Sequence, residues 1–486
     1  MPQRRPNVPS AVELLESRRL FSFAPANINL TGILATMEPS APPTITASGN
    51  QTAAAIAIDP ASPSHLFAVA NMDTGQGLLV AASADGGQTW APRVIANAAD
   101  ALPPAFGQAD AAFDAAGNLF LTYLNSSRNR IEVLLSADGG ANFTVVGQFS
   151  GNVAHPKVAA GGASVWVAFD RNNAVATTRA NDATPFAPFM TIARVVPGSV
   201  GGTLADLAVE AAAPAGTPQV IPPGEAAIAF QKAVTRTREG IYVSLRAPVG
   251  ASTVFSKPRL AATDHLGNHD LLPAQPTAAI DAGAQIAFAN PGDPTFGNRL
   301  YLVYADAASQ APPAMRGASV AQDTNIFLSY ADWPLTNWSK PAAIGAAGAA
   351  PGSRFLPRLS IDASASNATS DVAVVAWYDT SLDLGTGGPT DTDGVPNDDA
   401  EYAISLLTPN ATGMQAGAAQ VISALPSNER DAMNAAGYGD ALAFYNGVVL
   451  PFWSDNSNST NDNPSGTLRD FNAYTNAPLA SSGLAP

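Results

Sequence analysis

Short stretches in which apolar residues alternate with small or polar ones recur along most of the chain. The first group reads AAAIAID at 53–59, LFAVAN at 66–71 and LLVAAS at 78–83, with Gly-, Pro-, Asp- or Ser-containing segments between the groups. A period of two places successive side chains on opposite faces, which is typical of half-buried β-strands. The pattern therefore predicts an all-β protein of many short strands.

The stretches repeat as a unit in which three strands are recognisable. The first strands of the units are expected at 53–59, 108–114, 155–160, 204–210, 275–281, 356–362 and 439–444. A unit with one apolar face cannot bury that face alone, so neighbouring units must stack. With a fourth strand in each unit, the spacing predicts a single β-propeller of four-stranded blades around a central channel. Seven blades are favoured, and six is the alternative if units three and four merge or the seventh only completes the first.

The seventh unit has no obvious fourth strand. The segment INLTGILA at 28–35 precedes the first unit and is a candidate for this strand. Its pairing with the last unit would close the ring and remove the open edges of a terminal blade. The propeller is accordingly expected at 28–482, between an N-terminal segment at 1–27 and a tail at 483–486.

The turn SADGGQTW at 83–90, with a weaker copy SADGGANF at 136–143, is the most specific local motif. It resembles the Asp box of the sialidase (BNR-repeat) superfamily, which joins the third and fourth strands of propeller blades. The resemblance implies a structural turn on the rim of the blade. The residues that carry it are Ser83, Asp85, Gly87, Thr89 and Trp90 in the first copy and Ser136, Asp138 and Gly140 in the second.

The charge balance excludes several classes of partner. The net charge is −15, charged residues make up 13 % of the chain, and only four of them are Lys. This argues against nucleic acid or an anionic membrane as partner and is compatible with cation binding. There is no Cys, and no apolar run is long enough for a transmembrane helix.

The N-terminal segment differs in character from the rest. LESRRLFS at 15–22 resembles the LEPR-XLL motif of large extracellular proteins from planctomycete-type bacteria, although Ser17 stands where Pro is usual and Phe21 where Leu is. A short amphipathic helix at 11–20 is the alternative. The resemblance implies export, to the cell surface or beyond it.

In a propeller, the loops between strands two and three and those entering strand one gather around the channel mouth. Binding residues collect there because loops vary while blades stay rigid. An acidic residue in these loops can instead cap the amides at a strand end, and an arginine can instead form a salt bridge. The candidate ligand-binding residues on this face are Asp110, His155, Asp206, Arg238, Arg354, Arg358, Asp379, Asp440 and Asp455.

An exo-sialidase of the resembled family uses three arginines for the substrate carboxylate, because planar guanidinium groups bind it bidentately. Arg238, Arg354 and Arg358 would be a partial set. The Phe/Tyr-Arg-Ile-Pro segment that such enzymes carry near the first blade is missing, since the only Arg between 50 and 106 is Arg93. Catalytic residues are therefore not assigned.

An acidic segment, PTDTDGVPNDDAE at 389–401, is a candidate calcium site. Its oxygen-bearing side chains surround a Gly, as a hard cation prefers, and it resembles the D-x-D-G-x-P-D runs of calcium-binding repeats. A solvated acidic loop is the alternative. The candidate ligands are Asp391, Asp393, Asn397, Asp398 and Asp399.

Together these features predict an exported, monomeric, sialidase-like propeller that binds a glycan or another extracellular ligand at the channel mouth. The alternatives are an exo-α-sialidase-type glycoside hydrolase and a structural envelope protein. Calcium is the one cofactor for which the sequence offers ligands.

Overall fold

Seven antiparallel sheets, each with a path of four strands, follow one another along the chain, which confirms the prediction of seven blades. They belong to a computed structural model in which the described residues are 27–37, 49–73, 76–181, 189, 193–235, 238–246, 254–266, 270–307, 323–344, 352–364, 372–386, 394–410, 413–428, 438–457 and 470–484. Asp391 and Asp393 lie outside the described residues, as do residues 1–26.

Every blade has an innermost strand at the channel and three strands outward from it. The innermost strands are β2 (Gln51–Ile58), β6 (Ala105–Phe113), β10 (Val153–Gly161), β14 (Gly202–Val209), β20 (Gln285–Phe288), β24 (Arg354–Ile361) and β30 (Asp440–Tyr445). The second strands are β3 (Leu66–Met72), β7 (Leu119–Asn125), β11 (Ser164–Arg171), β15 (Ala226–Ala233), β21 (Arg299–Ala307), β25 (Ala373–Asp379) and β31 (Val448–Asp455).

The outer half of each blade completes the sheet. The third strands are β4 (Leu78–Ser83), β8 (Arg130–Ser136), β12 (Ala174–Asn181), β16 (Glu239–Leu245), β22 (Thr324–Asp332), β26 (Asp399–Asn410) and β32 (Asn472–Asn476). The outermost strands are β5 (Ala91–Ile95), β9 (Thr144–Ser150), β13 (Arg194–Val195), β17 (Arg259–Asp264), β23 (Ala342–Ile344), β27 (Gly413–Ala416) and β1 (Asn27–Asn29). Short β28 (Gln420–Val421), β29 (Ser427–Asn428) and β33 (Leu479–Ala480) extend blades six and seven.

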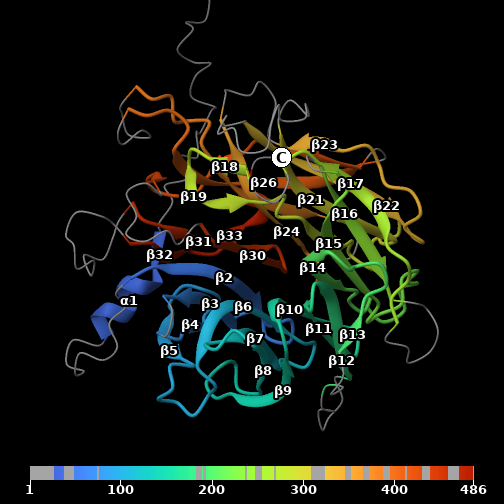
Figure 1. The fold of residues 1–486 in the computed structure, drawn as a ribbon, viewed down its shortest axis with the longest axis horizontal. Coiled ribbons are helices and arrows are strands. Elements are labelled where there is room, and N and C mark those ends of the chain that lie inside the picture. Colours follow the sequence, from blue (N-terminus) through green and yellow to red (C-terminus); the bar gives the residue numbers. More distant parts are fainter. Residues whose placement is uncertain are drawn as a thin grey trace, which may run out of the picture.

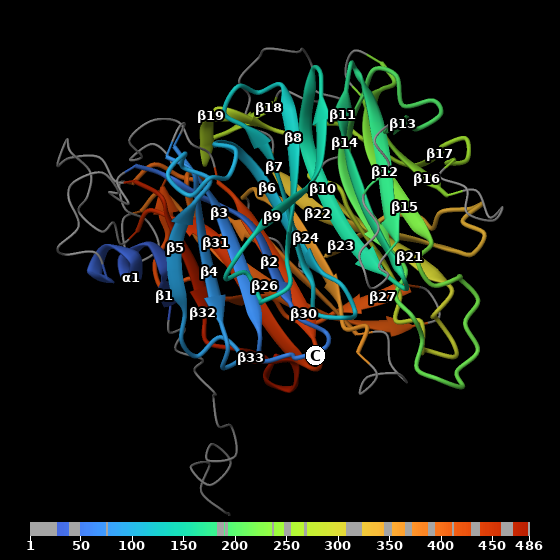
Figure 2. The same ribbon diagram turned by 90° about the horizontal axis from the view of Figure 1, so that it is seen from below.

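The blades form a closed ring, because each innermost strand contacts that of the next blade and β30 contacts β2 (Figure 1). Figure 2 shows the blue first blade beside the red seventh. Apolar side chains fill the space between neighbouring sheets, and Trp166, Trp377 and Trp453 are among the largest fully buried residues. Since the core lies between blades, each blade depends on its neighbours for burial.

The N-terminal segment closes the ring over a shorter stretch than expected. β1 pairs antiparallel with β32, the third strand of blade seven, through Asn27–Asn29 only. From Leu30 the chain continues as helix α1 (Leu30–Met37) instead of remaining extended to residue 35. Leu30 and Thr31 are buried, so the helix still contributes to the closure.

The innermost strand of blade five was assigned to the wrong segment by the sequence pattern. The stretch beginning at Gln275 is β19 (Gln275–Ile280), which pairs with β18 (Asp270–Leu272) in a separate two-stranded sheet. The innermost strand is the four-residue β20, which pairs with β21. Both segments are short and apolar, and the local pattern does not reveal which of them pairs with the second strand.

The two Gly-Gly turns join the third and fourth strands of blades one and two. Asp85 accepts hydrogen bonds from the backbone N–H and hydroxyl of Thr89, at 2.9 and 2.6 Å, and the Trp90 indole donates to the carbonyl of Gly87. In the second turn Asn142 occupies the place of Thr89 and donates to Asp138. These hydrogen bonds lower the pKa of Asp85 and of Asp138 to about 2.

Gly140 shows why the second turn requires glycine at this position. Its φ is 94°, and a Cβ atom there would lie 2.7 Å from the Phe67 ring of blade one, whereas Gly139 has φ 69° and open space around it. We expect Gly140→Ala to lower the free energy of unfolding by about 1–3 kcal/mol more than Gly139→Ala, because only the former adds a clash to the backbone strain. Urea unfolding of the two variants measures the difference, and equal losses would contradict this packing.

Candidate functional site

A ring of polar side chains lines the central channel at one level. The cavity there has a volume of about 210 Å³ and takes one residue from the innermost strand of each of six blades, with Ala54 at the corresponding place in blade one. The six polar residues are Asp110, Lys157, Asp206, Gln285, Arg358 and Asp440. The ring thus contains three carboxylates and two cations.

Backbone irregularities aim several of these side chains into the channel. The register shifts directly before Asp110, Lys157 and Arg358, and the residue two positions earlier has a left-handed φ, 55° at Gln108, 49° at His155 and 51° at Leu356. A bulge of this kind redirects the next side chain relative to the regular pleat. A similar shift precedes Asp206.

The ring residues also tie neighbouring blades together. Asp110 accepts a hydrogen bond from the backbone N–H of Val158 in the next blade, and Asp206 accepts one from Ile286, both at 2.8 Å. Arg358 donates to a carboxylate oxygen of Asp440 at 2.8 Å, across the junction of blades six and seven. Asp110 and Asp206 therefore each satisfy a backbone donor of a neighbouring blade.

Burial changes the titration of the ring. It raises the pKa of Asp206 to about 6 and that of Asp440 to about 6, although Lys157 and Arg358 respectively oppose the shift. Burial also raises the pKa of Asp110, against the attraction of Lys157, whose Nζ lies 3.9 Å from the Asp110 carboxylate. A carboxylate that is desolvated favours its neutral form.

These shifts predict that the folded protein loses stability as the pH rises through the range of the two carboxyls. Each raised pKa means that the folded state retains a proton that the unfolded state releases above about pH 3.8, so the free energy of unfolding falls between about pH 4 and pH 6. Asp206→Asn keeps an oxygen for Ile286 and removes one titration. In urea unfolding at pH 4.5, 5.5 and 6.5, the free energy of unfolding of this variant is expected to fall less steeply with pH than that of the wild type. The difference is up to about 1.4 kcal/mol per pH unit. Asp281→Asn, on an exposed side chain, is the control, and equal slopes in the two variants would contradict the prediction.

The remaining candidates at the ends of the second strands are held in local hydrogen bonds. Trp377 and Trp453 each donate their indole N–H to the aspartate two residues later, Asp379 and Asp455. Each of these aspartates also accepts the backbone N–H of the serine two residues further on. Both therefore cap the ends of strands, as the alternative interpretation of the sequence proposed.

The other predicted binding residues lie in three separate settings. The Arg354 guanidinium is buried between Asp379 and Asn325, at 2.9 and 2.8 Å. His155 is half exposed and its Nδ1 lies 2.8 Å from the Asp170 carboxylate at the end of β11. Arg238 is exposed on the loop between β15 and β16, and its carbonyl accepts the amides of Val234 and Thr235.

Within the described residues, the side chains of Arg238, Arg354 and Arg358 do not converge on one point where a substrate carboxylate could bind. Arg354 and Arg358 are on the same strand and four residues apart, a separation of roughly 13 Å along an extended chain. Each is paired with a different aspartate, Asp379 or Asp440. Two of the three guanidinium groups are therefore already neutralised by the protein itself.

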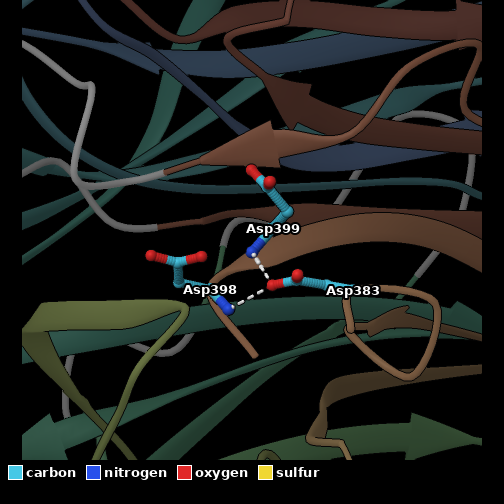
Figure 3. Close-up of side chains that lie close together, drawn as sticks. All are labelled: Asp383, Asp398 and Asp399. Carbon is cyan, nitrogen blue, oxygen red and sulfur yellow. Dashed lines mark hydrogen bonds between the residues drawn. The ribbon is translucent and has the colours of Figure 1, made fainter. Parts of the chain in front are cut away.

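Three buried carboxylates gather in blade six, and two of them belong to the predicted calcium segment (Figure 3). Oxygens of Asp383, Asp398 and Asp399 lie within 4.8 Å of one another, the largest separation for two oxygens that both lie about 2.4 Å from one calcium ion. Asp383 also accepts the backbone N–H groups of Asp398 and Asp399, at 2.7 and 2.9 Å. Asn397 lies apart from this set, since its amide oxygen accepts from Ser353 and Thr380. The sequence did not single out Asp383, which is fifteen residues from Asp398.

Calcium at this cluster stays a prediction. If the ion binds, 1 mM calcium should raise the temperature of unfolding, because a ligand that binds only the folded state stabilises it. Differential scanning calorimetry with and without a chelator measures the shift, and Asp383→Asn is expected to abolish it. If neither calcium nor the chelator changes the unfolding temperature, the prediction is wrong.

Comparisons with known proteins find structural likenesses only at low sequence identity. No model of a protein family matches the chain, and no curated protein matches it. Among solved structures, a leech intramolecular trans-sialidase is similar with a TM-score of 0.42 and 11 % identity, over 99 % of this chain and 73 % of that one. The polysaccharide lyase Uly1 has a TM-score of 0.45 and 7 % identity, over 86 % and 88 % of the two chains. The β-propeller domain of the Trilobed protease from Pyrococcus furiosus has a TM-score of 0.39 and 5 % identity, over 89 % and 98 %. Among the described residues no helix has the length and apolar character needed to cross a bilayer. The chain has the fold of a seven-bladed β-propeller, as its sheets and their order around the ring show.

Proposed function

We propose that this protein is an exported binding module that holds a glycan, or another extracellular ligand, at the mouth of its channel. The observation that carries the proposal is the convergence of carboxylate, amide and cationic side chains from six blades on one small cavity. Hydrogen-bond donors and acceptors set close together suit a ligand rich in hydroxyl groups, which offers both kinds of partner.

Binding is favoured over hydrolysis by the state of the arginines. A sialidase needs free guanidinium groups for the substrate carboxylate, whereas Arg354 and Arg358 are each paired with a buried aspartate. To bind a substrate there, the protein would have to leave Asp379 or Asp440 as a buried charge without its cation, which is costly. The exo-sialidase alternative is therefore the weaker of the two.

A glycan array tests the proposal. The wild-type protein is expected to be retained on at least one class of glycan, and Gln285→Ala should weaken retention about fivefold or more, since it removes an amide from the channel. Gln88→Ala, on the exposed rim turn, is the matched control and should leave retention unchanged. Retention on no glycan, or equal retention of both variants, would contradict a glycan site in the channel.

A further inference from the structure

A second cavity, of about 320 Å³, lies between blades four and five, on the face of the propeller opposite to the loops that join strands two and three. Blade four contributes the end of β16 and the start of β17, with Arg246, Lys257 and Arg259. Blade five contributes Trp333 and Trp338 from the turn between β22 and β23. Three cations and two indole rings thus line one pocket on a protein whose net charge is −15.

Two of the three cations are available to a ligand. Arg246 is paired with Glu225, its Nη2 lying 3.0 Å from a carboxylate oxygen. The side chains of Lys257 and Arg259 are exposed, and within the described part of the chain they form neither a hydrogen bond nor an ion pair. The pocket therefore carries an uncompensated positive charge.

Two indole rings form the aromatic wall of the pocket. Trp333 and Trp338 are both partly buried. The indole rings add a flat apolar surface next to the two free cations.

The corresponding arginine of blade one, Arg93, is not free, which distinguishes it from Arg259 in this pocket. The segments Pro92-Arg93 and Pro258-Arg259 both stand at the start of an outermost strand, after the turn from strand three. In blade one, however, the guanidinium donates to the carbonyl of Gly140 in the next blade. Arg259 makes no such hydrogen bond within the described residues, so its charge remains exposed in the cavity.

We propose that this pocket binds an acidic sugar residue, a pyranose that carries a carboxylate. The anionic group would lie against Lys257 and Arg259, and the apolar face of the ring would rest on an indole. The cavity is at the lower end of the range for small-molecule sites, about 300–1,000 Å³, and suits one or two sugar rings. The site is separate from the channel and does not depend on the function proposed there.

Isothermal titration and tryptophan fluorescence test the pocket with defined probes. A hyaluronan tetrasaccharide, which carries glucuronate carboxylates, is expected to bind and to change the tryptophan emission. Cellotetraose, a neutral sugar, should bind at least about tenfold more weakly, and sulfate alone should produce no change in emission. Binding of hyaluronan should weaken as salt rises, because the cations are exposed.

Variants test whether the pocket residues hold the probe. Arg259→Gln and Trp338→Leu, which removes the flat ring, should each reduce affinity about tenfold. Arg194→Gln, an exposed arginine on the outermost strand of blade three, is the matched control and should bind normally. The proposal is overturned if the tetrasaccharide does not bind, if cellotetraose or sulfate binds equally well, or if neither pocket variant changes the affinity.

Discussion

Replacing Arg358 by Met is expected to lower the free energy of unfolding by about 3–5 kcal/mol at pH 8. The side chain forms the ion pair with Asp440 across the junction of blades six and seven, and Asp440 is fully buried. Without the guanidinium, the carboxylate keeps the hydroxyl of Tyr402, at 3.1 Å, as its side-chain donor. A buried charge with so little compensation destabilises the folded state strongly. Urea unfolding measures the loss.

The pH dependence of this variant distinguishes a lost ion pair from lost packing. Burial already raises the pKa of Asp440 to about 6 in the presence of Arg358, so removal of the guanidinium raises the pKa of Asp440 further. At pH 5 the carboxyl of the variant is protonated in the folded state, and the loss relative to the wild type should be smaller than at pH 8. Lys157→Met, whose partner lies farther away at 3.9 Å, is the control and should cost less. Equal losses at both pH values would mean that packing, not charge, dominates.

Deletion of residues 1–37 is expected to cost about 4 kcal/mol or more, or to prevent folding. It removes β1 and α1 and with them the burial of Leu30, the hydrogen bond that Thr31 accepts from the backbone of Ala473, and the pairing of β1 with β32. The third strand of blade seven would then be an open edge, which favours association between molecules. Thermal unfolding and light scattering measure the two effects.

The matched control is deletion of residues 1–26, which keeps β1 and α1 whole. This shorter deletion should leave the stability close to that of the full chain. If the two deletions behave alike, closure through the N-terminal strand contributes little and the ring is held by the contacts between blades alone.

The sequence identifies the blades well because the innermost and second strands of most units carry a clear period of two. It fails where the pattern is ambiguous. The apolar run after Ile28 fits a strand and a helix equally, and the helix begins at Leu30. In blade five, the strand at 275–280 and the shorter one at 285–288 both fit, and only the pairing with β21 decides between them.

The sequence predicted four residues of the candidate site, but not which of them interact with one another. Asp110, Asp206, Arg358 and Asp440 were singled out because they precede or begin innermost strands, and all four line the channel cavity. That Arg358 pairs with Asp440, eighty-two residues away, depends on the packing of blade six against blade seven. Lys157 and Gln285 were missed, although each stands on an innermost strand, where one polar residue interrupts the small and apolar ones.

Incubation with a fluorogenic sialoside is the most direct test of the claim that Arg354 and Arg358 stabilise the propeller and do not take part in catalysis. With Arg354 and Arg358 held by Asp379 and Asp440, we expect fluorophore release no faster than in the buffer blank, across pH 4–8. Release of the fluorophore above the blank would contradict the account.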